Sequence, residues 1–355
     1  MKPIYIVSWL FALAVSFVSC DDWLDKTPKD RLYPDVYFKT EDELRLFTNQ
    51  FYNNLVPSAV DIYSESSDLI VKSDLMLEMS GQRIIPDEGN GWNFTALRDI
   101  NFYLQYSHNC TEVNARNRYD GVARFFRAYF YFEKVKRYGD IPWYDKALDS
   151  DDPELYKARD SREFVMQKML EDLDFAIANL PKTKNAYVLT RWTALALKSR
   201  VCLFEGTFRK YHGLEDCEKY LNACVSASET FMNESGYTLY KSGSTPYRDL
   251  FASINLQADE VIFGRDYEAS LSVLHNVQNY ENSTTMGRPG MNKKIVNSYL
   301  MADGSRFTDK AGYETMTFDQ ECQNRDPRLA QTIRTPGYTR IGSTKKEAPN
   351  LAYTM

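Results

Sequence analysis

The chain has 355 residues, of which 43% are hydrophobic and 14% are aromatic. A chain of this composition can bury a large apolar core, which excludes disorder as its main state. The formal net charge is −6, and the sequence contains no basic stretch with interleaved aromatic residues. We therefore expect no nucleic acid partner. The length suits one large domain or two ordinary ones.

Residues 1–19 predict a lipoprotein signal peptide. Lys2 precedes an apolar run over residues 4–18, and Ser19 stands directly before Cys20. The run is too short for a transmembrane helix, and it has the charged start and small-residue end of a cleaved signal. We expect cleavage before Cys20, acylation of its thiol and anchoring of the exported chain by lipid. An ordinary secretory signal or an N-terminal membrane anchor is the alternative.

The remaining cysteines do not form a disulfide framework, because their number is odd and their spacing irregular. Two of them, Cys217 and Cys224, fall two turns apart on one expected helix, about 10 Å along its axis, which is too far for a bridge. We expect buried thiols that act as small hydrophobic groups. The five are Cys110, Cys202, Cys217, Cys224 and Cys322.

Helical periodicity dominates the chain from residue 40 to residue 234. Thr40 and Glu43 have the spacing of a capping box, and Pro57 ends the helix that they open. A second helix is expected over residues 95–114. A third, over residues 124–138, carries an aromatic stripe that indicates a core helix, and Gly139 is its expected C-cap.

Three further helices follow an acidic stretch over residues 145–160. Asp160 and Glu163 are expected to frame a capping box, Thr190 is expected to cap the next helix, and the last helix is expected to include Leu214. Short connections between these elements favour an α-helical layer built from helix hairpins.

A weak repeat signal accompanies the helices. Ala128 and Phe132 fit the A-x3-F element of a tetratricopeptide repeat, and Ala196 follows Ala128 at twice the roughly 34-residue period. Ordinary helix packing with small residues at close crossings explains the same spacing equally well.

The amino-acid composition changes at residue 235, where Gly, Ser, Asn, Asp and Pro become frequent. A short strand is expected over residues 260–264 and a short helix over residues 293–301. We therefore expect a helical part over residues 20–234 and a loop-rich part over residues 235–355. Loops on a rigid scaffold are where binding groups concentrate.

Several segments, in order, resemble the SusD/RagB family of Bacteroidetes outer-membrane lipoproteins. The stretch after Cys20 is similar to the family's aromatic-Leu-acid-x-x-Pro opening, and the best-marked stretch contains the sequences RAYFYF and YGDIP. The family normally continues well past the Asp-Pro-Arg segment, so the end at Met355 is expected to reflect a truncated product or fragment. The similar segments are residues 22–28, 92–104, 127–142, 172–181, 194–201, 288–290, 296–304 and 324–329.

The resemblance implies a mainly α fold of the SusD type, in which helical hairpins with tetratricopeptide-like repeats support a loop-rich ligand-binding region. It also implies a lipid-anchored protein on the outer face of the outer membrane. Such a protein captures glycans without catalysis and delivers them to a SusC-type TonB-dependent transporter. Peptides would be the cargo if the chain follows the RagB branch.

The inventory of reactive groups favours binding over catalysis. The three histidines are widely spaced, and no HExxH, Walker A, GxSxG or dinucleotide-type glycine motif occurs. We expect no metal and no cofactor. Asp149, Asp151 and Asp152 do not fit an EF-hand, so a solvated acidic loop is favoured. A surface glycosidase needs only two carboxylates at a set separation, and 49 acidic residues leave that alternative open.

A sugar site needs flat aromatic faces with polar groups at their edges, in a concave setting. Segment 265–287 offers Tyr267, His275, Asn279 and Tyr280, and the resemblance favours the same stretch, although an ordinary polar loop has similar composition. Trp92 is a second candidate, with a core anchor as its other interpretation. A tetratricopeptide scaffold that binds only protein is the remaining alternative.

Overall fold

The computed structural model describes residues 36–57, 69–71, 77–86, 89, 91–275, 290–347 and 349. The expected signal peptide, Cys20, Asn279 and Tyr280 lie outside these residues. The described part is mainly helical, as predicted. Its one sheet pairs β1 (Ile70–Val71) with β2 (Gly290–Met291) in antiparallel fashion, with Ile70 opposite Met291.

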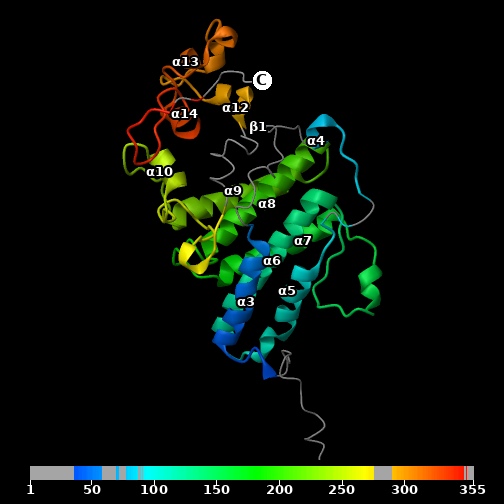
Figure 1. Ribbon diagram of the computed structural model, residues 1–355. Helices are drawn as coiled ribbons and strands as arrows, with labels where there is room; N and C mark the ends of the chain where they lie inside the picture. Colours follow the sequence, from blue (N-terminus) through cyan, green and yellow to red (C-terminus); the bar gives the residue numbers. More distant parts are fainter. Residues whose placement is uncertain are drawn as a thin grey trace, which may run out of the picture.

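The N-terminal part is a layer of helices in which α6, α7, α8 and α9 pack in chain order, while α3 and α5 pack against α6 (Figure 1). This arrangement agrees with the predicted hairpins. A short helix, α4 (Leu77–Ser80), precedes α5. The main helices are α3 (Glu41–Leu55), α5 (Thr95–Tyr106), α6 (Val113–Tyr138), α7 (Arg162–Asn179), α8 (Arg191–His212) and α9 (Cys217–Glu234).

Local capping signals predicted the helix ends well. The Thr40 hydroxyl accepts the Glu43 N–H at 3.3 Å, and the Glu43 carboxylate accepts the Thr40 N–H at 3.0 Å. Thr190 and Thr193 form the equivalent pair at the start of α8. Gly139 ends α6 with φ 70°, a conformation that favours glycine.

Several helix boundaries differ from prediction. The helix expected over residues 124–138 is longer, because α6 already begins at Val113. The helix expected over residues 95–114 ends at Tyr106, because a 3-10 turn (Ser107–Asn109) and the extended, buried Cys110 separate it from α6. Ser161 caps α7 in place of Asp160, whose carboxylate instead accepts the Trp143 N–H at 2.7 Å. Leu214 precedes α9 and lies outside it.

The aromatic stripe of α6 lies in the core, as predicted: Phe125, Phe126 and Phe132 are all buried. Ala128 is also fully buried at this position, whereas Ala196 is half-buried. Cys110 and Cys202 are the buried thiols; Cys217, Cys224 and Cys322 are half-buried, and all five are free.

The loop-rich part follows α9 and reaches the upper region of Figure 1. Segment 260–264 forms no strand within the described residues; instead the Gly264 N–H donates to the carbonyl of Ala186 at 2.8 Å. The helix expected over residues 293–301 is shorter. The helices of this part are α10 (Pro246–Ala252), α12 (Lys293–Ser298), α13 (Phe318–Glu321) and α14 (Pro327–Thr332).

Arg325 organises the described C-terminal residues. Its guanidinium donates to the carbonyls of Val296 and Tyr299, each at 2.8 Å, and to that of Glu321 at 2.8 Å. Asp326 and Arg328 form an adjacent ion pair at 2.6 Å. Arg325 thereby connects the end of α12 to the end of α13.

A buried ion pair joins α6 to α7. The Arg127 guanidinium donates to both oxygens of Asp172, at 2.6 and 2.8 Å, and to the amide oxygen of Asn101 at 3.2 Å. The Asn101 amide nitrogen in turn donates to the carbonyls of Tyr144 and Lys146, at 2.8 and 3.2 Å. The core pair is thus connected to the segment that follows α6.

Tyr131 makes a second connection to the same segment. Its hydroxyl donates to the Pro142 carbonyl at 3.2 Å and accepts the Tyr144 N–H at 2.6 Å. Its ring stacks on Trp143, with centroids 4.3 Å apart. Burial raises the pKa of Tyr131, so the hydroxyl stays protonated and keeps both hydrogen bonds.

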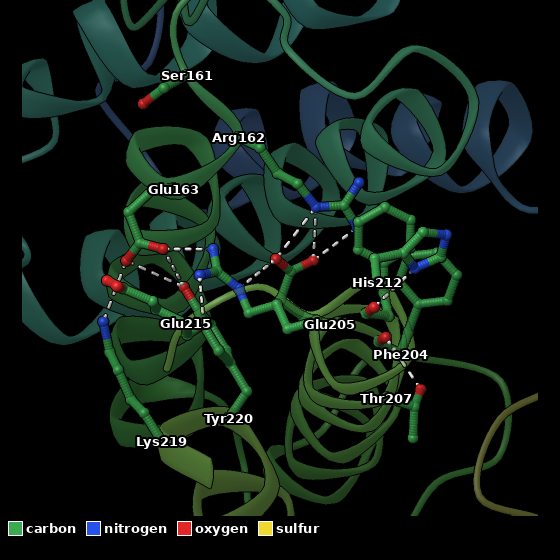
Figure 2. A network of polar contacts seen from close by, with 12 residues as sticks. Ser161, Arg162, Glu163, Phe204, Glu205, Thr207, His212, Glu215, Lys219 and Tyr220 are labelled. Atoms are coloured by element: carbon green, nitrogen blue, oxygen red, sulfur yellow. Dashed lines mark hydrogen bonds and ion pairs between the residues drawn. The ribbon is translucent and has the colours of Figure 1, made fainter. Parts of the chain in front are cut away.

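A second charged network joins α7, α8 and α9 (Figure 2). The fully buried Glu205 accepts hydrogen bonds from Arg162 at 2.6 Å and from Arg209 at 2.8 Å. Arg209 also pairs with Glu163, which Lys219 and the Tyr220 hydroxyl contact as well. Partial burial favours a higher pKa for the Glu163 carboxyl, but Lys219 and Arg209 outweigh this effect. The pKa of Glu163 is therefore lowered, and the carboxylate stays ionised near neutral pH.

We expect Glu205→Gln to lower the free energy of unfolding by about 3 kcal/mol, because the two arginines lose their shared buried carboxylate. Urea denaturation of the lipid-free chain from residue 21, followed by circular dichroism, measures this loss. Glu171→Gln removes an exposed carboxylate that pairs with Lys168 and should cost less than about 1 kcal/mol. Equal losses in the two variants would contradict the structural role of Glu205.

We expect Tyr131→Phe to cost about 1–2 kcal/mol, because the Pro142 carbonyl and the Tyr144 N–H both lose a partner. Hydrogen–deuterium exchange should become faster at residues 141–148. Tyr129→Phe is the matched control, since Tyr129 is half-buried on the same helix and its hydroxyl makes no hydrogen bond within the described part. Unchanged exchange in Tyr131→Phe would refute this role.

Candidate functional site

A pocket of about 520 Å³ opens between the start of α5 and the segment that joins α6 to α7. Aromatic, apolar and cationic side chains line it together, which is the composition of a binding site for a small polar ligand. Its lining residues are Trp92, Phe94, Thr95, Leu97, Arg98, Asn101, Pro142, Tyr144, Lys146, Leu148, Leu155, Lys157, Ala158 and Arg159.

Trp92 stands at the edge of this pocket and is not a core anchor, because 39% of it is exposed. Phe94 and Tyr138 meet its ring edge-on, with centroids 5.3 and 4.9 Å away. The Arg159 guanidinium lies 4.8 Å from its ring centroid. Three neighbours therefore fix the orientation of an indole that remains open to solvent.

The floor of the pocket rests on the core. Leu97, Tyr144 and Leu148 are buried there, and Asn101 is only 1% exposed. The amide oxygen of Asn101 accepts a hydrogen bond from Arg127, and its amide nitrogen donates to the Tyr144 carbonyl. These two bonds fix the distance between α5 and the segment that follows α6. Such a site is largely formed before a ligand arrives.

Four cations and no carboxylate line the pocket. Lys146 pairs with Glu154 at 3.0 Å outside the lining, and this contact raises the pKa of Lys146. Lys157 pairs with Asp160 at 3.0 Å and donates to the Trp143 carbonyl at 2.6 Å. Lys146 and Lys157 thus line the pocket, while the carboxylates that pair with them are not part of its lining.

The other cations of the lining are Arg98 and Arg159. Arg98 donates to the Leu148 carbonyl at 3.2 Å and lies 3.9 Å from Asp149, with both side chains largely exposed. Within the described residues, no carboxylate pairs with Arg159.

The loop candidates lie elsewhere. The rings of Tyr267 and His275 meet edge-on, with centroids 4.8 Å apart, so the structure brings these two residues together. Tyr267 is half-buried and His275 is exposed. Neither lines the pocket around Trp92, and Asn279 and Tyr280 are outside the described residues.

Sequence reasoning missed the cationic lining. Lys157 and Arg159 belong to the stretch 145–160, which was interpreted as polar and acidic. Of the aspartates expected in a solvated loop, Asp149 and Asp151 are exposed and Asp152 is half-buried. The basic residues within the stretch were an available signal, but only the fold brings Arg159 to Trp92. Over the described ranges, no group of His, Cys, Asp and Glu has the geometry of a metal site.

No helix among the described residues is long and apolar enough to cross a membrane.

Two models of one protein family match successive parts of the chain. Residues 80–191 match a model described as "Starch-binding associating with outer membrane", and residues 228–354 match the model of the SusD family. The first segment contains every residue that lines the pocket.

Curated relatives support the same assignment. Two SusD-like proteins of Formosa agariphila are 26% identical over 294 residues and 24% identical over 226 residues. These matches cover 77% and 58% of this chain, and 55% and 43% of the relatives. The chain spans about half the length of the curated relatives it matches.

Solved structures share the fold. A SusD-like protein of Bacteroides fragilis superposes with a TM-score of 0.69 at 22% identity, covering 88% of this chain and 64% of that one. A SusD-like carbohydrate-binding protein of the same organism gives 0.64 at 17% identity, covering 89% and 63%. Family models match most of the chain, and the curated relatives and solved structures described above are all SusD-like. The chain therefore belongs to the SusD/RagB family.

Proposed function

We propose that this chain captures glycans at the pocket between α5 and the segment after α6, as part of a non-catalytic cell-surface lipoprotein. The observation that carries the proposal is Trp92, a partly exposed indole fixed at the mouth of a preformed pocket. An aromatic face packs against the C–H groups of a sugar ring, while polar groups at its edge bind the hydroxyls.

The remaining lining suits a sugar in size and chemistry. About 520 Å³ is within the usual range for small-ligand pockets and admits a short saccharide segment. Thr95, Arg98 and Lys157 supply hydrogen-bond donors around the apolar floor. A glycosidase would need two carboxylates beside the scissile bond, and none lines this pocket, so capture without cleavage is the better proposal for this site.

Delivery to a SusC-type TonB-dependent transporter completes the proposal. It is supported by the family assignment, by the family description that places starch binding at the outer membrane, and by the signal peptide predicted over residues 1–19, directly before Cys20. Similar folds include a crystal structure with xylogluco-oligosaccharide, with a TM-score of 0.54 at 17% identity over 73% of this chain and 55% of that one. Peptides are the alternative cargo.

We expect Trp92→Ala to weaken glycan binding at least about tenfold, because the ring platform is lost. The lipid-free chain from residue 21 is first screened against starch, xyloglucan, pectin, alginate and chondroitin sulfate fragments and against peptide mixtures, and hits are measured by calorimetry. Tyr211→Ala is the matched control, since Tyr211 is an exposed aromatic residue outside the pocket. A chain that melts cooperatively yet binds only peptides, or nothing, would refute glycan capture.

We expect Cys20→Ala to abolish lipid attachment, because Cys20 is the cysteine that directly follows the predicted signal peptide. Expression in a Bacteroidetes host with radiolabelled palmitate should label the unchanged protein and leave this variant unlabelled and outside the membrane fraction. Cys217→Ala should still be labelled. Label that persists in Cys20→Ala would disprove the anchor.

A further inference from the structure

We infer that this pocket selects anionic saccharides, and that Arg159 is the residue that binds their carboxylate or sulfate group. The inference rests on the proposed function and narrows its substrate class. It starts from the charge of the lining, which contains four cations and no acid although the whole chain carries a net charge of −6. The residues that line the pocket therefore carry positive charge in a chain that is negative as a whole, although three of these cations also pair with nearby carboxylates.

Arg159 differs from the other three cations. Lys146 pairs with Glu154 and lies 3.4 Å from Asp152, Lys157 pairs with Asp160, and Arg98 lies near Asp149. Among the described residues, no carboxylate pairs with Arg159, whose guanidinium lies over the ring of Trp92. A guanidinium carries five N–H donors in a fixed plane, so Arg159 keeps donors available for a ligand.

The contact between Arg159 and Trp92 places charge recognition beside ring recognition. The guanidinium lies 4.8 Å from the indole centroid, an attractive geometry that orients it without neutralising it. A planar guanidinium binds a carboxylate or sulfate through two parallel hydrogen bonds. A sugar held at the exposed part of Trp92 would present a ring substituent to Arg159.

The start of α5 adds an independent preference for negative charge. The first turn of this 12-residue helix contains no acidic residue, and Phe94 at the N-cap supplies no side-chain hydrogen bond. The Thr95 N–H is accepted by Asn93 at 2.8 Å, while Thr95, Leu97 and Arg98 line the pocket. The positive end of the helix dipole therefore lies at the site.

The carboxylates beside the other three cations leave Arg159 unneutralised. Glu154 and Asp149 are 48% and 86% exposed in their side chains, whereas Asp152 and Asp160 are 22% and 31% exposed. The exposed pairs contribute little because water screens them, and none of these four carboxylates pairs with Arg159. Arg159 is itself exposed, so salt also screens its attraction for a bound anion. Its advantage over the other three cations is that no carboxylate among the described residues pairs with it. A neutral sugar gains hydrogen bonds from the same cations but no attraction between opposite charges.

The test compares saccharides that differ only in charge. Calorimetry with the chain from residue 21 to residue 355 uses oligogalacturonate against its methyl ester, and chondroitin sulfate oligosaccharide against its desulfated form. We expect at least one charged ligand to bind about tenfold more tightly than its matched partner, with the preference shrinking in about 0.5 M NaCl. The pair that shows the preference identifies carboxylate or sulfate as the recognised group.

Arg159→Gln should remove most of the charge preference and change the affinity for the neutral partner by less than about twofold. Arg200→Gln, which removes an exposed arginine on α8 outside the pocket, should leave both affinities unchanged. Thermal melting verifies that both variants fold.

Each other outcome overturns the inference. Equal binding of charged and neutral saccharides would refute charge selection while leaving glycan capture intact. If Arg159→Gln still prefers the charged saccharide, Arg159 is not the residue that binds the carboxylate or sulfate group. Binding of no saccharide by a cooperatively folded chain would overturn both this inference and the proposed function, and Arg159-dependent binding of acidic peptides alone would do the same.

Discussion

The ion pair between Arg127 and Asp172 is the constraint on which the described helical part depends. Both side chains are almost fully excluded from water, at 8% and 3% exposed, and burying two charges is unfavourable unless their geometry is excellent. Here the pair is bidentate, and Asn101 accepts a third hydrogen bond from the guanidinium. The same Asn101 amide donates to carbonyls of the segment after α6. The distance between α5 and that segment, which together line the pocket, therefore depends on the buried ion pair.

What could be predicted from the sequence was local. The Thr40 capping box and the Gly139 C-cap depend on a few neighbouring residues, and both were confirmed. The boundary near Cys110 was wrong because tertiary packing, not periodicity, draws that residue into the core in extended form. Asp160 fits a cap by its spacing, yet the Trp143 N–H competes for its carboxylate from a distant turn.

The candidate site shows the same division. Trp92 could be named in advance because an indole before a helix is conspicuous, but whether it faced the core or solvent depended on Phe94 and Tyr138. Arg159 could not be named, since it lies in an acidic stretch and reaches Trp92 only through the fold. The loop expected to hold Tyr267 and His275 keeps these two side chains together but adds nothing to this pocket.

The contact between Trp92 and Arg159 has an optical consequence. Trp143 and Trp192 are buried at 5% and 3% exposure, so Trp92 is the solvent-accessible tryptophan of the described residues. Its emission depends on the nearby guanidinium and on water reaching the ring. Displacement of either would change the emission of Trp92 more than that of the two buried tryptophans among the described residues. The protein thus carries a fluorescent probe of pocket occupancy at the position where a ligand would enter.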